Sequence, residues 1–113
     1  MNVEVLKGKT LVSCETDNRD FIRFKTTDGE EYLMHHEQDC CEVVEIEDIC
    51  GDLQTLVGKP ILVAEENSNS CESDESYTWT FYKFATFDGY VTIRWYGTSN
   101  GYYSESVDFD KVE

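Results

Sequence analysis

The residue types best suited to chemistry gather in one short segment of this sequence, residues 36–42, which reads HEQDCCE. Histidine and cysteine are the preferred zinc ligands in proteins, and a thiol beside a histidine base can act as a nucleophile. Against a metal site, the adjacent Cys40 and Cys41 would point to opposite faces of a strand. Neither C-x-x-C nor H-x-x-x-H spacing occurs, and a nucleophile would need His36 within hydrogen-bond reach of a thiol.

We therefore interpret the segment as structural, with buried cysteines acting as small hydrophobic residues. Gln38 and Asp39 would then form hydrogen bonds to the backbone of their own turn. A metal-binding structural role for His36, Cys40 and Cys41 stays open as an alternative.

Other signatures of enzymes are missing from the sequence. Gly8-Lys9-Thr10 lacks the glycine spacing of a phosphate-binding loop and precedes a predicted strand instead of a helix. No G-x-S-x-G elbow occurs. Paired acids such as Glu65-Glu66 leave a two-carboxylate hydrolase open, but no pair stands out. We expect a protein that is not an enzyme, and we assign no catalytic residue, no metal ligand and no cofactor.

A binding function has more support, because acidic residues are concentrated in the middle of the chain. The net charge is −15, and residues 37–76 hold twelve acids and one base, a net charge of −11. Such a field repels nucleic acid and anionic membranes and attracts a basic protein surface. We expect a basic partner protein, no direct nucleic-acid binding, no membrane, and a monomer or homodimer. Solubility alone is the competing explanation of the charge.

The acids after the cysteines could imitate a nucleic-acid backbone. Glu45 and Glu47 share one face of a predicted strand, with Val44 and Ile46 on the other. Alternate strand residues lie ~6.6–6.8 Å apart, about twice the ~3.4 Å rise per phosphate of a DNA strand. The candidate partner-binding residues are His36, Gln38, Asp39, Glu42, Glu45, Glu47, Asp48, Glu65, Glu66, Glu72, Asp74 and Glu75.

The aromatic residues of the second half suggest a different function. They could line a cleft between two structural units and sequester a small nucleotide signal, with an arginine meeting its phosphate. The candidate cleft residues are Trp79, Arg94, Trp95, Tyr96, Tyr102 and Tyr103. The charge of −15 opposes such an anionic ligand, and most of these side chains are typical core residues.

Three phrases recur in order along the chain and indicate an internal duplication. L-x-G-K begins at residues 6 and 56, F-x-[RK]-F-x-T-x-D-G begins at residues 21 and 81, and residues 42–49 resemble residues 105–112. Because each repeat is too small to bury its own apolar face, we expect the two to share a core. We predict one domain, residues 1–113, with repeats 1–49 and 51–113.

The elements that carry these residues are predicted to be strands. Alternating and aromatic patterns favour strands over residues 10–16, 20–27, 30–36, 41–47, 60–66, 77–86, 90–96 and 102–109. One short helical turn capped by Asp52 joins the repeats, and residues 67–76 are expected to form a flexible acidic loop. The predicted fold is mostly β, two similar four-stranded antiparallel units packed as a small sandwich or barrel.

Several long motifs resemble a family of small acidic phage proteins of unknown function. They include HxQDCCE from residue 36, YTWTFYK from residue 77, YVTIRWYG from residue 90 and YYSESVDF from residue 102. The resemblance implies a viral origin and the cytoplasm of a bacterial host, and five cysteines without a secretory signal agree with reduced thiols there. We therefore expect a phage protein that binds and inhibits a host component of antiviral defence or nucleic-acid handling.

Overall fold

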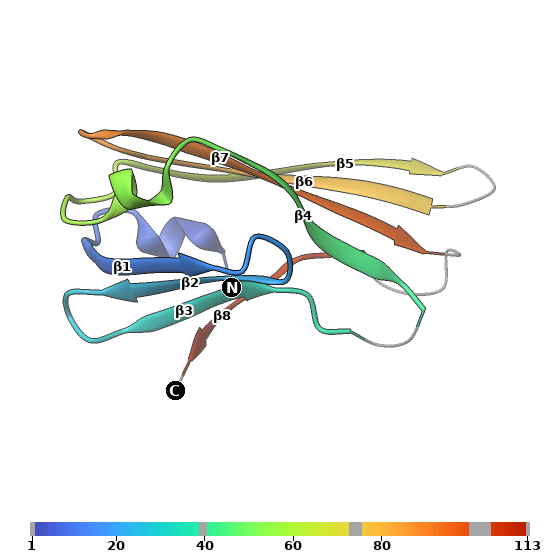
Figure 1. The fold of residues 1–113 in the computed structure, drawn as a ribbon, viewed down its shortest axis with the longest axis horizontal. Coiled ribbons are helices and arrows are strands. Elements are labelled where there is room, and N and C mark those ends of the chain that lie inside the picture. Colours follow the sequence, from blue (N-terminus) through green and yellow to red (C-terminus); the bar gives the residue numbers. More distant parts are fainter. Residues whose placement is uncertain (1, 39–40, 73–75, 100–104, 113) are drawn as a thin grey trace.

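The chain forms two four-stranded antiparallel sheets that face each other as a sandwich (Figure 1). The computed structural model describes residues 2–38, 41–72, 76–99 and 105–112, with the side chains of residues 71 and 72 left out. The first sheet has the order β1 (Leu11–Thr16), β2 (Phe21–Thr26), β3 (Glu31–His35) and β8 (Asp108–Val112). The second has the order β4 (Val43–Cys50), β7 (Gly89–Ser99), β6 (Ser76–Thr86) and β5 (Val63–Glu72).

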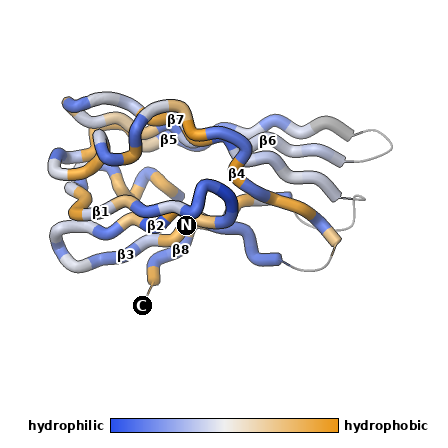
Figure 2. Tube along the Cα trace, in the orientation of Figure 1, coloured by the Kyte–Doolittle hydropathy of each residue, from blue (hydrophilic) through white to orange (hydrophobic). Residues whose placement is uncertain are grey.

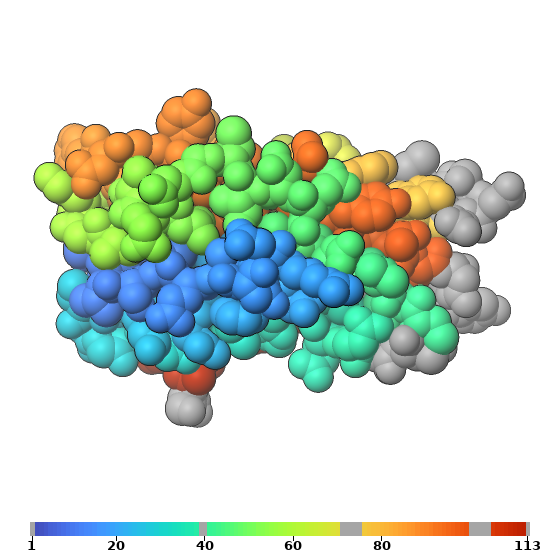
Figure 3. Space-filling view, in the orientation of Figure 1, coloured from blue at the N-terminus to red at the C-terminus, as the bar shows by residue number. Residues whose placement is uncertain are grey.

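Two short 3₁₀ turns, η1 (Val3–Leu6) and η2 (Leu53–Leu56), precede the strands of each half. The predicted turn at η2 is confirmed, since the Asp52 carboxylate accepts a hydrogen bond from the Gln54 backbone N–H at 2.9 Å. The turn at η1 was not predicted. In the space-filling view, the chain around η2 packs directly on β1 along one side of the sandwich (Figure 3). Among the described residues, no helix is long and apolar enough to cross a membrane.

The core lies between the two sheets because alternate residues of each strand point inward. β2 and β3 alternate buried and half-buried positions along their whole length. Phe24 packs against Phe84 of the opposite sheet with ring centroids 5.5 Å apart, and Trp95 is completely buried. Hydrophobic residues are densest at the end of the sandwich that contains η2, whereas β5 and β6 become hydrophilic toward the other end (Figure 2). The predicted mostly-β sandwich of two four-stranded antiparallel sheets is confirmed.

Each sheet takes its fourth strand from the other half of the chain. Both halves run in the order 3₁₀ turn, then four strands. Nevertheless β4 pairs with β7 of the second half, and β8 pairs with β3 of the first half. The sequence did not predict this exchange, because strand patterns indicate which face is buried and not which neighbour a strand pairs with. Neither half can therefore form its sheet without the other.

The two halves meet through equivalent residues near their starts. Thr10 and Pro60, which follow the two L-x-G-K phrases, form a β-bridge with each other. The Gly8 N–H donates to the Ile61 carbonyl at 2.7 Å, and the Gly58 N–H donates to the Leu11 carbonyl at 2.9 Å. Gly8 and Gly58 have φ angles of 87° and 91°, a region that favours glycine. The shared glycines thus let the halves approach each other in the same way from both sides.

The predicted flexible loop over residues 67–76 is wrong where the structure describes it. Residues 67–72 continue β5, Ser76 begins β6, and residues 73–75 lie outside the described residues. Ten consecutive pairs, from Val63 with Ala85 to Glu72 with Ser76, join the two strands. The long, threonine- and aromatic-rich β6 provides a template that outweighs the low strand preference of asparagine and serine.

The last predicted strand is also placed differently. β8 begins at Asp108 instead of residue 102, and residues 105–107 connect it to the second sheet without regular structure. Residues 100–104 lie outside the described residues.

Candidate functional site

The outer face of the second sheet presents a group of three aromatic rings. Tyr77 and Trp79 of β6 and Tyr96 of β7 point away from the core, since their neighbours Thr80 and Trp95 are buried on the other side. Ring centroids are 5.2 Å apart for Trp79 and Tyr96, 6.0 Å for Tyr77 and Tyr96, and 6.3 Å for Tyr77 and Trp79. All three side chains are half-buried. We call these three residues the aromatic cluster.

Strand register sets what flanks the aromatic cluster. Trp79 pairs with Asn69 of β5 on one side and with Tyr96 on the other, and Tyr96 pairs with Glu45 of β4. Directly paired residues point to the same face of a sheet. The cluster therefore lies in a row that runs from an amide on β5, across two rings, to a carboxylate on β4.

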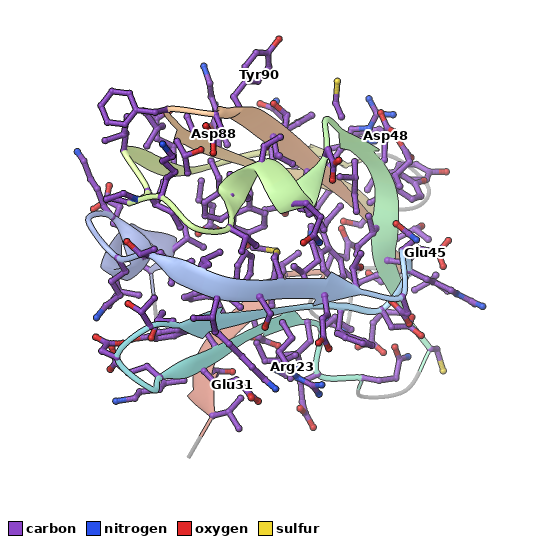
Figure 4. All side chains as sticks on the ribbon, turned by 60° about the vertical axis from the view of Figure 1, so that its left-hand side comes forward. Arg23, Glu31, Glu45, Asp48, Asp88 and Tyr90 are labelled. Atoms are coloured by element: carbon purple, nitrogen blue, oxygen red, sulfur yellow. The ribbon has the colours of Figure 1, made fainter. Side chains whose placement is uncertain are left out.

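The charged side of this face consists of ion pairs on β4. The Arg94 guanidinium of β7 lies 2.6 Å from the Glu47 carboxylate, and Arg19, in the β1–β2 turn, donates to Glu45 at 3.2 Å. Asp48 pairs with Arg94 in the ladder and projects outward, as Tyr90 does at the far end of β7 (Figure 4). This rim is polar, and its two arginines are each occupied by a glutamate.

A hollow of about 410 Å³ lies beside the aromatic cluster at the β5 edge of the sheet. Its lining comprises Glu4, Glu65, Glu66, Asn67, Phe81, Lys83 and Thr92. The Tyr82 hydroxyl donates to Glu66 at 3.3 Å. Burial, and then the nearby Glu66 charge, raise the pKa of Tyr82, so this phenol stays protonated and orients the carboxylate. Three carboxylates and one ammonium give this hollow an acidic lining.

The outer face of the first sheet has a different character. Arg23 lies 3.5 Å from Glu31 and 4.0 Å from Glu15, and Lys25 lies 3.8 Å from Glu31. Arg23 and Glu31 both project from the outer side of this layer (Figure 4). Because its charges are mutually paired and it carries no comparable ring cluster among the described residues, we do not regard this face as the candidate site.

The even spacing expected for the carboxylates of Glu45 and Glu47 is wrong, and both groups form ion pairs within the chain. Glu45 and Glu47 are each ion-paired with an arginine. The β4–β7 ladder also shifts register between Ile46 and Asp48, so a bulge at Glu47 breaks the even spacing. Glu65 and Glu66 are exposed on the opposite edge strand, β5. Asp39, Asp74 and Glu75, and the side chain of Glu72, lie outside the described residues.

The predicted cleft between two units is also wrong. Trp79, Arg94 and Tyr96 lie on the outer face, whereas Trp95 is completely buried between the sheets. The Trp95 indole N–H donates to the Met34 sulfur at 3.2 Å, so its polar atom is satisfied inside the core. Tyr102 and Tyr103 lie outside the described residues.

Residues 36–42, which contain the histidine and cysteines considered as metal ligands or as a nucleophile and its base, form a corner where the chain passes from β3 to β4. The His36 side chain is 4% exposed, and its Nδ1 lies 2.7 Å from the Ser106 carbonyl, so this nitrogen carries a proton and donates. Its Nε2 lies 3.6 Å from the buried Glu42 carboxylate. Gln38 donates to the Glu42 carbonyl at 2.7 Å and to its carboxylate at 2.8 Å. These contacts hold the side chains of His36 and Glu42 in the interior of the corner.

The cysteines of this corner do not behave as expected. Cys41 is exposed, so its predicted burial is wrong, and Cys40 lies outside the described residues. No group of three or more His, Cys, Asp or Glu side chains in the described ranges could hold a metal ion. Of the three cysteines whose side chains are described, Cys14 is buried, and burial raises its pKa to about 12, which suppresses the nucleophilic thiolate.

A second buried glutamate, Glu105, was missed by the sequence reasoning. Its carboxylate accepts hydrogen bonds from Thr78 at 2.7 Å, Ser76 at 3.2 Å and Ser99 at 2.5 Å. A Cβ at Gly97 would lie 2.9 Å from the Glu105 carbonyl, so only glycine leaves room for this close approach. The signal was present in the repeat, because Glu105 aligns with Glu42 at the start of the third recurring phrase.

Another hollow, of about 560 Å³, lies on the side of the sandwich between β1 and the chain around η2. Cys14, Glu15, Ile49 and Gln54 are among its lining residues. The Gln54 amide donates to the Cys14 carbonyl at 3.2 Å across it. Its described lining includes the carboxylates of Glu15 and Asp52 but no aromatic ring, so it is a weaker candidate than the outer face of the second sheet.

Comparison with known proteins places the whole chain in one family and gives no activity. No curated protein and no solved structure matches the chain. A family model described as "Domain of unknown function (DUF7448)" matches residues 4–109, a span that covers β1 to β7 and the start of β8. The chain therefore belongs to this family of domains of unknown function.

Proposed function

We propose that this protein is a non-enzymatic binding protein that recognises a basic protein surface with the outer face of its second sheet. The observation that supports it best is the aromatic cluster, three half-buried rings in contact on the outer face of the second sheet. Tyrosine, tryptophan and arginine dominate the binding energy of protein interfaces. Tyr77, Trp79, Tyr96 and the neighbouring Arg94 are such residues, and none of them is needed to fill the core.

The charge distribution supports a basic partner. Residues 37–76, with a net charge of −11, contain both edge strands of this sheet, β4 and β5. The aromatic cluster on the central strands is thus bordered on both sides by the most acidic part of the sequence. An acidic border accelerates encounter with a cationic surface and disfavours anionic partners, while the rings provide the desolvated contact.

This proposal differs from the nucleic-acid mimicry considered from the sequence, which required regularly spaced carboxylates. Two glutamates of β4 are already paired with Arg19 and Arg94, so recognition does not depend on a repeating phosphate-like row. If the resemblance to phage proteins holds, the partner would be a host protein of nucleic-acid handling or antiviral defence. Such proteins carry the basic surfaces that this face would fit.

Parallel affinity capture from bacterial lysate with three forms of the protein tests the proposal. The forms are the wild type, the double variant Trp79→Ala/Tyr96→Ala, and Phe87→Ala, which removes an aromatic ring that is 78% exposed in the β6–β7 turn. We expect wild type and Phe87→Ala to retain the same basic protein, and the double variant to lose it. Binding of the purified partner should then weaken with increasing salt.

Charge-reversing substitutions distinguish the contribution of the acidic border to binding from that of the aromatic cluster. Glu45→Lys and Glu65→Lys change one carboxylate on each edge strand, the half-buried Glu45 and the exposed Glu65, and we expect them chiefly to slow association. Equal capture by wild type and by a folded Trp79→Ala/Tyr96→Ala variant would remove the outer face from consideration. Thermal unfolding of each variant verifies that the fold is intact.

A further inference from the structure

Two of the four sheet edges in this sandwich, β1 and β4, are protected against further strand pairing by bulges and by neighbouring chain. β1 has a register shift between Leu11 and Ser13, and its Leu11 and Cys14 carbonyls accept hydrogen bonds from the chain around η2. β4 has its own bulge, and the Ile46 N–H donates to the Arg19 carbonyl at 2.7 Å. Bulges and covering loops are common devices that keep edge strands from pairing with other chains.

The two remaining edges differ in length and composition. β8 has five residues, and three of them, Asp108, Asp110 and Lys111, are charged. β5 has ten residues, and its ladder with β6 runs through ten consecutive pairs without a register shift. It contains neither proline nor lysine, and no other strand of the described chain pairs with its outer side. The turn η1 packs against β5, and Glu4 of that turn lies beside Glu65 and Glu66. Among the described strands, β5 is therefore the long and regular edge that no further strand pairs with.

We propose that an extended segment of the basic partner adds to this edge of β5 as a fifth strand. The main chain of β5 would supply the hydrogen bonds, as in other complexes formed by strand addition. This inference rests on the proposed function for the charge of the partner, and goes beyond it by assigning a second contact region and a binding geometry.

The charge of β5 favours pairing with a basic strand over pairing with a second copy of this chain. Glu65 and Glu66 lie along β5, and a second copy of the chain would bring the same acids together with a net charge of −15. Like charges on facing strands destabilise pairing, whereas opposite charges stabilise it. The acids that disfavour pairing of β5 with the β5 strand of a second chain are therefore complementary in charge to a strand rich in arginine or lysine.

The acidic hollow lies at the same edge and fits this occupant. Glu4, Glu65 and Glu66 border it, and the Phe81 ring forms part of its wall. A strand paired with β5 would run about 4.8 Å away, with side chains directed alternately to the two faces. An arginine at the matching position would meet these carboxylates and could stack on the phenylalanine ring.

A matched pair of synthetic peptides tests strand addition. One is a capped peptide of about eight residues alternating threonine and arginine, and the other is identical except for N-methylation of every second residue. N-methylation removes the hydrogen-bond donors of one strand edge and keeps the charge. We expect the first peptide to bind with increased hydrogen-exchange protection of amides in residues 67–72, and the methylated peptide to bind about tenfold more weakly.

Two adjacent proline variants give an independent readout from the protein side. Successive N–H groups on a strand alternate between its neighbour and its open edge, so Ser68→Pro and Asn69→Pro remove donors on opposite sides. The variant that retains the native melting temperature has lost an edge donor, and it should bind the unmethylated peptide more weakly. Retained binding by that variant would overturn strand addition.

The peptide outcomes distinguish this inference from the proposed function. Equal binding of both peptides, or no binding of either, overturns strand addition at β5. In either case the proposed function is tested separately, by comparing affinity capture by the wild type with capture by the Trp79→Ala/Tyr96→Ala variant. Loss of capture in that variant together with equal binding of the peptides would leave the outer face as the sole contact region.

Discussion

The two buried glutamates occupy equivalent positions in the two halves, and different partners hold them. Glu42 ends the first crossover, residues 36–42, where the chain passes from β3 to β4. Glu105 lies in the second crossover, residues 100–107, where it passes from β7 to β8. Glu42 contacts Gln38 and His36 of its own crossover. Glu105 instead accepts hydrogen bonds from three hydroxyls on β6 and β7.

The comparison shows that the buried carboxylate is common to both crossovers, whereas the groups that form hydrogen bonds with it differ. Both crossovers place a carboxylate at the point where the chain leaves one sheet for the other, and both carboxylates are almost fully buried. A buried carboxylate is costly unless its hydrogen bonds are satisfied, and an amide or hydroxyls can satisfy it. The Gln38 amide in the first crossover and the hydroxyls around Glu105 in the second are thus two solutions to one structural problem.

The largest effect should come from removing the carboxylate held by the second sheet. Glu105→Ala leaves the hydroxyls of Ser76, Thr78 and Ser99 without their shared acceptor at a buried site. Hydrogen bonds to a charged group contribute about 1.5–3 kcal/mol. We expect the free energy of unfolding to fall by about 3 kcal/mol, measured by urea denaturation.

Two further variants make this measurement specific. Glu37→Ala removes an exposed carboxylate from the other crossover and should change stability by less than about 0.5 kcal/mol. Gly97→Ala introduces a Cβ 2.9 Å from the Glu105 carbonyl and should destabilise by about 1–3 kcal/mol. A neutral Gly97→Ala would show that the second crossover can shift, and would weaken the case for Glu105 as its anchor.

Removing the equivalent carboxylate of the first crossover should cost less. Glu42→Ala removes the acceptor of one Gln38 hydrogen bond and the charge facing His36. The hydrogen bond from Gln38 to the Glu42 backbone carbonyl survives, because it does not involve the replaced side chain. We expect a loss of about 2 kcal/mol in the same urea assay. A loss larger than that of Glu105→Ala would reverse the comparison.

The sequence predicted the layers of the fold and missed the exchange that joins them. Periodicity of two identifies buried faces, and glycines with Asp52 identify turns, so two sheets and η2 followed from local patterns. The pairing of β4 with β7 depends on contacts between residues about 50 apart in the sequence. The strand formed by residues 67–72 depends on its long partner β6, and local preference alone favoured a loop.

The candidate site was predicted only in part, for a physical reason. Trp79, Arg94 and Tyr96 were selected for their types, but alternation along β7 separates Trp95 from Tyr96 onto opposite faces. His36 and Glu42 were selected because their chemistry is versatile, and burial makes them structural. Residue types indicate what a side chain can do, whereas exposure decides whether a partner can reach it.

The next largest loss of unfolding free energy should come from breaking the hydrogen bond that links the two crossovers. His36 donates its Nδ1 proton to the Ser106 carbonyl of the second crossover at 2.7 Å. His36→Ala removes this donor, and we expect a loss of about 1–2 kcal/mol. His36→Asn places an amide N–H close to the position of the imidazole Nδ1 and should recover part of the loss. If both variants are equally destabilised, the histidine acts through packing and its link to Ser106 is unimportant.

The smallest expected effects are those of single hydroxyls around Glu105. Thr78→Val keeps the side-chain shape and removes the donor at 2.7 Å, whereas Ser76→Ala removes the donor at 3.2 Å. Because shorter hydrogen bonds to a carboxylate are stronger, Thr78→Val should cost about 1 kcal/mol and Ser76→Ala about half of that. Both stay well below Glu105→Ala if the remaining hydroxyls continue to satisfy the carboxylate. A Thr78→Val loss equal to that of Glu105→Ala would mean that one hydroxyl accounts for the whole contribution of Glu105 to the second crossover.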